Sequence, residues 1–274
     1  MRLLQLPPPE ALRPAEADLA WVIVPCSRPQ NLERVLANFT RQKFPFKKLV
    51  VVLNGEARSL TPMQQLRLDN HQALVLTSDH HQSAAKNTAL YEIKKRGGGF
   101  TVVMDDDDWY GPQYLTEAVG YARTYDIIGK RRHFVHVLGD LWLCTRELRL
   151  QEGGWLTGGT IACWAENCPD YSVKHDFGED AAFCQAAVAR GMTIFSTDVY
   201  QYLYYRGWSQ AHTWKMSPQQ LRHYESARSA LDLGPCDLSL VTGEKLSVLG
   251  QRLSPHDERV TLAPPDTGSE AHVV

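Results

Sequence analysis

The four consecutive aspartates at positions 105–108, called the aspartate run below, have the clearest capacity for chemistry in this sequence. Neighbouring carboxylates repel one another, and neither a sheet nor a turn requires them. Because side chains alternate in direction along an extended chain, Asp105 and Asp107 can point the same way. Two carboxylates on one side form an oxygen site for a hard divalent cation such as Mg²⁺ or Mn²⁺, which keeps positions open for substrate phosphates. The alternative is a solvated acidic turn that caps a helix starting near Pro112.

Glu179 and Asp180 form a second acidic pair, at the start of a helix predicted over residues 179–190 and ended by Gly191. Acidic side chains favour the first helical turn because they interact with the positive end of the helix dipole. From the residues alone, this structural explanation is the better one for the pair.

Strands and helices alternate along the chain before the aspartate run. Apolar segments typical of strands occupy residues 21–24, 49–53, 73–76 and 100–104, and helical patterns occupy 31–41, 61–68 and 83–96. Continuous apolar runs of this kind suit strands that are buried on both faces of a parallel sheet. Three strand–helix repeats followed by a strand predict an α/β fold with a doubly wound, mainly parallel sheet.

A polar segment follows each of the four strands, at residues 26–28, 54–56, 78–80 and 105–108. In sheets of this class, ligands bind outside the carboxyl ends of the strands. We therefore expect these segments to form one polar rim that includes the aspartate run.

The second half of the chain has a less regular pattern. It predicts a hairpin over residues 133–137 and 140–145, a glycine-rich stretch at 153–160, the helix at 179–190 and one strand from 193 to 205. After about residue 254 the composition becomes polar and proline-rich, which predicts a frayed tail.

Composition restricts the classes of partner. The 274 residues carry a formal net charge of −2, which gives no global electrostatic reason to bind nucleic acid or an anionic membrane. No apolar window is long enough to span a bilayer, and the N-terminus lacks the basic-then-apolar order of a signal peptide. The six cysteines include no CxxC pair. These features predict a reduced, cytoplasmic protein without an integral membrane segment.

The segment Val-Met-Asp-Asp-Asp-Asp-Trp-Tyr-Gly-Pro at 103–112 resembles the Asp-x-Asp segment of family 2 glycosyltransferases, in which an apolar strand ends in Asp-x-Asp-Asp and a proline follows. Four other blocks resemble the family in order and spacing: Val-Ile-Val-Pro at 22–25 with Arg28, Val-Val-Val-Leu-Asn-Gly at 50–55, Ser-Ala-Ala-Lys-Asn-Thr-Ala-Leu at 83–90 and Gly-Glu-Asp at 178–180. The resemblance runs from about residue 21 to residue 214, which is most of the chain.

The resemblance implies a GT-A fold, with helices on both faces of the central sheet and a small antiparallel β region. Around a catalytic domain at 19–225 we expect a flexible, proline-rich segment at 1–18 and a C-terminal extension at 226–274 that is largely irregular after about residue 254. Within the catalytic domain, residues 19–112 would form the nucleotide-binding half and 113–225 the acceptor half.

The implied activity is metal-dependent, inverting transfer of a sugar from a nucleotide-diphosphate sugar to an acceptor nucleophile. By resemblance, Asp107 would be the principal metal ligand, and Asp105 would contact the metal or the donor ribose. Asp180 would be the general base, and Glu179 would position the acceptor or its loop. His212 could complete the metal shell, although an ordinary surface histidine explains it equally well.

By resemblance, the donor-binding positions would be Pro25, Ser27, Arg28, Asn54, Asp79, Lys86, Asp105 and Asp106. Asn54 departs from the aspartate that is usual in the family. Its amide oxygen can still accept the N3–H of uracil, so we expect a UDP-sugar donor. Lys86 replaces the more usual arginine, which keeps the charge but loses the bidentate fork.

Two other functions use the same residues differently. A sugar-nucleotide pyrophosphorylase or other nucleotidyltransferase would share the fold class and the metal, but it would carry a glycine-rich loop with Arg and Lys after the first strand. The segment Pro-Cys-Ser-Arg-Pro at 25–29 lacks that loop. A non-catalytic sugar-nucleotide-binding module would not need Asp105, Asp107 and Asp180 together. The acceptor stays open among a peptide, a natural product, a glycan and a modified nucleic-acid base, and so does the oligomeric state.

Overall fold

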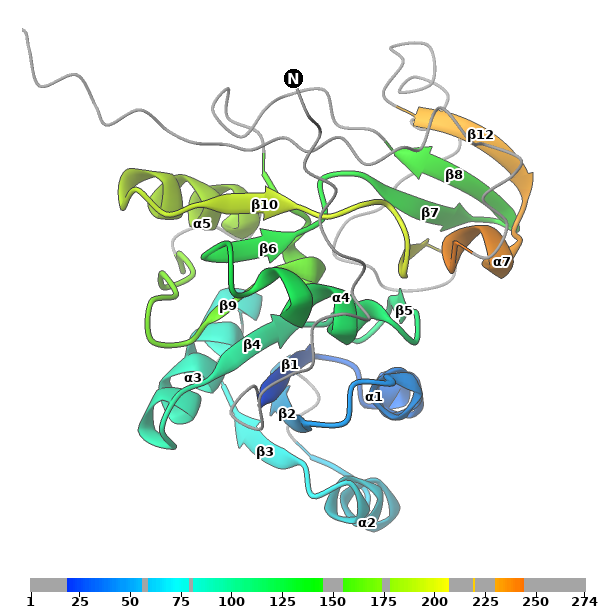
Figure 1. The fold of residues 1–274 in the computed structure, drawn as a ribbon. Coiled ribbons are helices and arrows are strands. Elements are labelled where there is room, and N and C mark those ends of the chain that lie inside the picture. The colour runs from blue at the N-terminus through cyan, green and yellow to red at the C-terminus, as the bar shows by residue number, and fades with distance from the viewer. Residues whose placement is uncertain are drawn as a thin grey trace, which may run out of the picture.

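The computed structural model describes residues 19–55, 59–78, 81–144, 155–173, 178–206, 219 and 230–243. These residues form two sheets flanked by helices (Figure 1). The first sheet has seven strands in the order β10-β6-β9-β4-β1-β2-β3. Its strands are β1 (Ala20–Cys26), β2 (Lys47–Leu53), β3 (Leu74–Thr77), β4 (Phe100–Val103), β6 (Ile127–Gly129), β9 (Ala162–Trp164) and β10 (Ile194–Ser196). Every pairing is parallel except those of β9 with β4 and β6, which confirms the predicted mainly parallel α/β sheet.

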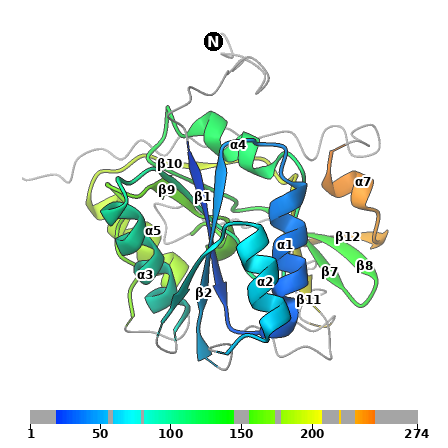
Figure 2. The same cartoon turned by 90° about the horizontal axis from the view of Figure 1, so that it is seen from below.

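Helices cover both faces of this sheet (Figure 2). They are α1 (Leu32–Arg41), α2 (Pro62–Asn70), α3 (Gln82–Lys95), α4 (Tyr114–Tyr121) and α5 (Glu179–Ala189). Alternate residues of β1 face opposite ways, so Val22 shares a core with Val35 of α1, whereas Ile23 shares one with Ala89 of α3. No helix in the described ranges combines the length and apolar character needed to cross a bilayer.

Local sequence signals account for the helix boundaries. At the start of α2, Thr61 and Gln64 form a capping box ahead of Pro62. The α3 helix ends before Gly97, whose φ of +100° is a backbone conformation that suits glycine. These features give the helices the positions that the sequence predicts.

The second sheet has five strands in the order β12-β8-β7-β11-β5. They are β5 (Trp109–Tyr110), β7 (His133–Val137), β8 (Asp140–Cys144), β11 (Tyr202–Arg206) and β12 (Ala230–Pro235). The β7–β8 hairpin confirms the predicted one, while β7 and β11 pair in parallel. Residues 230–243 of the expected C-terminal extension form β12, which pairs with β8, and α7 (Leu238–Val241). The small β region thus draws strands from distant parts of the chain.

The single strand predicted over residues 193–205 is wrong, because the structure has two strands there. The first, β10, lies in the seven-stranded sheet, and the second, β11, lies in the other sheet. Between them Asp198 accepts a hydrogen bond from the backbone N–H of Tyr200, and Gln201 adopts a φ of +66°. This turn contains no glycine or proline, so the apolar and aromatic pattern of the sequence conceals it.

The cysteines also differ from the expectation of a fully reduced chain. Cys163 in β9 and Cys168 in the following turn form a disulfide, with their Cα atoms 5.9 Å apart. The backbone N–H of Cys168 donates to the carbonyl of Trp164, which turns the chain back toward β9. The cytoplasmic location therefore stays a prediction from the sequence.

Candidate active site

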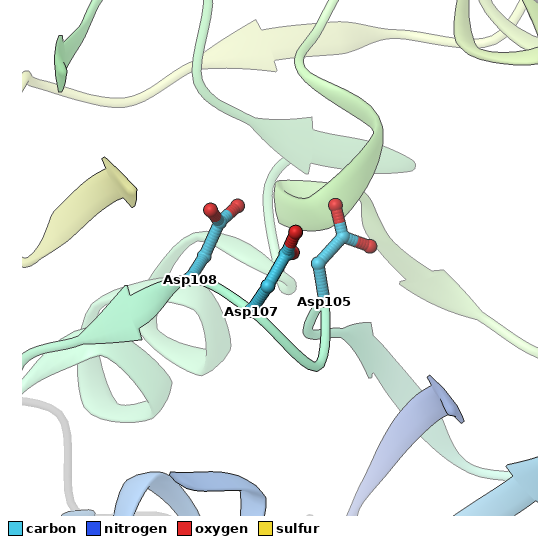
Figure 3. Close-up of side chains that lie close together, drawn as sticks. All are labelled: Asp105, Asp107 and Asp108. Carbon is cyan, nitrogen blue, oxygen red and sulfur yellow. The ribbon is translucent and has the colours of Figure 1, made fainter. Parts of the chain in front are cut away.

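The aspartate run begins one residue after β4, at the carboxyl end of this strand of the central sheet. Its residues form a turn rather than an extended strand. The carboxylates of Asp105, Asp107 and Asp108 point to the same side (Figure 3), and one ligand oxygen from each lies within 4.8 Å of the others. Asp105 and Asp107 therefore point the same way, as predicted, but a turn and not the alternation of an extended strand brings them together, and it adds Asp108 to the pair. Asp106, Asp107 and Asp108 are buried, which excludes the alternative of a solvated acidic turn.

Asp105 is fixed through its backbone by the buried hydroxyl of Tyr110. The N–H of Asp105 donates to this hydroxyl at 2.7 Å, and the hydroxyl donates to the carbonyl of Gly159 at 2.7 Å. The buried Oδ1 of Asp105 has no hydrogen-bond partner among the described residues. Loss of solvent raises the pKa of Asp105 to about 8, and the positive charge of Lys86 opposes part of that rise. A buried carboxylate oxygen without a partner fits a metal ligand.

Asp108 is held by three donors from β11. The hydroxyl of Tyr202 donates to its Oδ2 at 2.6 Å, while the N–H of Tyr205 and the Nη1 of Arg206 donate to its Oδ1 at 3.0 and 3.1 Å. Burial raises the pKa of Asp108 to about 6, and the Arg206 charge limits the rise. The second sheet thus positions one carboxylate of the metal set.

Asp106 points to a different set of partners. Its Oδ1 accepts from Arg28 at 2.7 Å and from Asn31 at 3.3 Å. The same Arg28 guanidinium lies 3.0 Å from the Oδ2 of Asp107, and the Arg206 Nη1 lies 3.8 Å from that oxygen. Two arginines therefore flank Asp107 in this structure.

Residues of α1 hold the backbone of the run. Arg34 donates to the carbonyl oxygen of Asp107, and Asn38 donates to that of Asp108 at 2.9 Å. Because α1 packs on the central sheet, these bonds fix the run relative to the whole domain.

The predicted nucleoside positions lie at the neighbouring strand ends. Pro25 lies in β1 in register with Val52 of β2, and the half-buried Ser27 follows β1. Asn54 follows β2, where its N–H donates to the carbonyl of Cys26 at 3.1 Å. Its side chain is buried, and the structure describes no hydrogen-bond partner for its Oδ1. Asp79 lies outside the described residues.

Lys86, Glu179 and Asp180 meet at the glycine pair of the short helix η5 (Gly158–Thr160). The buried Lys86 Nζ lies 3.4 Å from the Oε1 of Glu179. A Cβ added to Gly158 would lie 3.5 Å both from this Nζ and from the Cβ of Asp180. A Cβ added to Gly159 would lie 2.6 Å from the Oδ2 of Asp105. One turn thus touches the expected base, the expected donor lysine and the metal set, whereas His212 falls outside the described ranges.

The sequence did not single out four residues that build this site: Asp108, Tyr110, Tyr202 and Arg206. Asp108 is part of the run, but in an extended chain its side chain would point away from those of Asp105 and Asp107. The contacts of Tyr202 and Arg206 with Asp108 span 94 and 98 residues, and no local pattern reports them.

The family model described as Glycosyl transferase family 2 matches residues 21–183, more than half of the chain. The chain belongs to glycosyl transferase family 2. The matched region contains every strand-end segment described above, the aspartate run, Lys86, Glu179 and Asp180. The two sheets and the helices on both faces of the larger one are accordingly those of the GT-A fold.

Two solved structures of S. aureus TarS agree with this fold. S. aureus TarS 1-349 is 17% identical with a TM-score of 0.51, over 68% of this chain and 60% of that one. The same protein in complex with UDP-GlcNAc is 17% identical with a TM-score of 0.51, over 77% and 64%. A mannosyltransferase from Pyrobaculum calidifontis is 18% identical with a TM-score of 0.48, over 65% and 54%. The chain thus spans less than two thirds of each of these proteins, and no curated protein matches it in sequence.

Proposed function

We propose that this glycosyltransferase moves a sugar from a UDP-sugar to an acceptor nucleophile, with inversion and with the help of a divalent cation. One observation carries the proposal. Three carboxylates converge within 4.8 Å at the carboxyl end of β4, and a buried oxygen of Asp105 has no partner in the described part of the chain. Such a set suits Mn²⁺ or Mg²⁺.

Asp105, Asp107 and Asp108 would hold this cation, and His212 is a proposed further ligand. A bound divalent cation stabilises the negative charge of the departing nucleoside diphosphate. Tyr202 orients the carboxylate of Asp108 and Tyr110 fixes the backbone of Asp105, so both residues are held in place before any substrate arrives.

Asn54 supports uracil as the base of the donor. Its buried Oδ1 offers an acceptor that the N3–H of uracil can use. Pro25, Ser27 and Arg28 at the end of β1, together with Asp79, would complete the nucleoside site. The complex of TarS with UDP-GlcNAc, a protein of similar fold, also favours a uridine nucleotide.

Asp180 is the proposed general base. It lies at the start of α5, beside the turn whose other glycine touches Asp105. In the proposed reaction its carboxylate takes the proton of the acceptor while the acceptor attacks the anomeric carbon. The bond to the diphosphate breaks on the opposite side, so the configuration inverts. Glu179 and Lys86 form an ion pair beside this turn and would position the donor and the acceptor.

A donor panel tests the proposal without knowledge of the acceptor. We expect slow hydrolysis of a UDP-sugar, detected by mass spectrometry, that requires Mn²⁺ or Mg²⁺ and disappears in Asp107→Asn. The exposed Asp170 gives a matched control, because Asp170→Asn makes the same chemical change away from the site. Turnover that persists in EDTA or in Asp107→Asn would overturn the metal role, and NMR of the released sugar would check inversion.

A further inference from the structure

Arg206 is a buried cation that the proposed mechanism does not yet use. It is the last residue of β11, and its side chain is 7% exposed. Its Nη1 donates to the Oδ1 of Asp108 at 3.1 Å and to the carbonyl of Tyr205, and its guanidinium lies over the Tyr204 ring. The guanidinium therefore has a fixed position at the edge of the metal set.

Arg206 lies beside two of the three carboxylates that could hold a divalent cation. Its Nη1 is 3.1 Å from Asp108 Oδ1 and 3.8 Å from Asp107 Oδ2. Asp108 has other donors, since Tyr202 and the Tyr205 N–H already bind both of its oxygens. Asp108 is thus anchored without the arginine, so anchoring alone does not explain a buried charge at this place.

The Nε–H of Arg206 supplies an independent observation. It is buried and has no hydrogen-bond partner within the described ranges. A buried donor without an acceptor is unfavourable, so such groups are usually satisfied by a ligand or another group. The planar guanidinium has five N–H donors and matches phosphate oxygens in a bidentate way.

We propose that Arg206 is a diphosphate-binding residue of the donor site, which competes with the cation for Asp107 and Asp108 in the empty protein and binds donor phosphate oxygens once the cation is present. This inference rests on the proposed function. It requires only a change of partner by one guanidinium, because the bonds from Tyr202 and Tyr205 keep Asp108 in place.

The two roles of Arg206 predict opposite effects of its removal. Without the guanidinium, the carboxylates lose a competing positive charge, so Mn²⁺ alone should bind about threefold to tenfold more tightly. Because the diphosphate loses a charged hydrogen bond, UDP should bind about tenfold or more weakly at saturating Mn²⁺. If Arg206 had a purely structural role, its removal would weaken the binding of both Mn²⁺ and UDP, or of neither.

Isothermal titration of the full chain separates these cases, first with Mn²⁺ alone and then with UDP added to the Mn²⁺-loaded protein. Arg206→Gln should show tighter Mn²⁺ and weaker UDP. Arg206→Lys, which keeps the charge but lacks the fork, should leave Mn²⁺ affinity near that of the wild type and weaken UDP severalfold. Arg96→Gln removes one positive charge from the exposed end of α3 and should change neither affinity.

Two results would overturn the proposed roles of Arg206. Unchanged UDP affinity in both Arg206 variants would overturn the phosphate role, and weaker Mn²⁺ binding in Arg206→Gln would overturn the competition. If Arg206→Gln does not fold, by circular dichroism, Arg206→Lys alone supplies the test through UDP. Failure of the wild type to bind Mn²⁺ and UDP would refute the proposed function itself, which is a distinct outcome.

Discussion

At the residue scale, Asp105 links the site to the stability of the fold. Desolvation raises its pKa to about 8, whereas an aspartate in an unfolded chain has a pKa of about 3.9. Between these values the folded, metal-free protein binds the proton more tightly than the unfolded chain does. The free energy of unfolding should therefore fall as the pH rises toward 8.

Asp105→Asn removes this titration, because an amide is neutral at every pH. In the wild type, the free energy of unfolding should fall by an amount on the order of 1–3 kcal/mol between about pH 5.5 and about pH 8.5. In Asp105→Asn this fall should be absent. Urea denaturation in EDTA at several pH values measures it. Asp170→Asn should keep the wild-type slope, and an unchanged slope in Asp105→Asn would contradict the assignment of this proton to Asp105.

Asn54 determines how strictly the site can read a pyrimidine. A carboxamide can rotate to present its NH₂ group to the N3 of cytosine, but a carboxylate can only accept. Asn54→Asp should therefore increase the preference for UDP over CDP by about tenfold. The carboxylate accepts a hydrogen bond from the N3–H of uracil but repels the lone pair on the N3 of cytosine. Competition binding in Mn²⁺ checks the ratio, with the exposed Asn70→Asp as a charge-matched control. An unchanged ratio would remove Asn54 from the base pocket.

At the scale of elements, the η5 turn provides two neighbouring glycines with different surroundings. A Cβ on Gly159 would lie 2.6 Å from the Oδ2 of Asp105 and 3.0 Å from the Tyr110 hydroxyl. One on Gly158 would meet only ordinary contacts at 3.5 Å or more. Gly159→Ala must therefore displace Asp105, and we expect Mn²⁺ affinity to fall about tenfold or more. Gly158→Ala serves as the matched control, with Mn²⁺ affinity close to the wild type by calorimetry; equal affinities in both variants would count against Asp105 as a ligand.

The elements that could be predicted from sequence share a simple physical origin. Strands β1, β2 and β4 are continuous apolar runs, and α1 to α3 carry helical spacing or clear end signals. Three-residue strands such as β6 and β9 are too short to show a period. The turn before β11 has no glycine or proline to mark it in the sequence.

The residues of the site also divide into those that the sequence predicts and those that it does not. Asp105 and Asp107 were predictable because four adjacent carboxylates have no structural reason to occur. Tyr202 and Arg206 were not, because their role depends on how the second sheet packs against the run. Only the folded chain brings β11 to Asp108.

At the scale of the whole molecule, the aspartate run joins the two sheets. It leaves β4 of the seven-stranded sheet and leads into β5 of the five-stranded one, where β5 pairs with β11. The aromatic ring of Tyr110 packs against those of Tyr114 and Tyr202 at this junction. A cation held by Asp105 and Asp108 would therefore connect residues that are anchored in different sheets.

Cation binding should consequently protect both sheets. Ligand that binds only the folded state at about one hundred times its Kd adds about 2.7 kcal/mol of stability. We expect Mn²⁺ to raise the Tm and to slow amide hydrogen exchange in β4 and also in β11. In Asp108→Asn, Mn²⁺ should slow amide exchange in β11 less than it does in the wild type, and this loss should be larger than the loss in β4. The asparagine keeps hydrogen bonds to β11 but no longer provides a charged ligand that ties the cation to that strand. Protection confined to the run in the wild-type protein would show that the metal does not couple the two sheets.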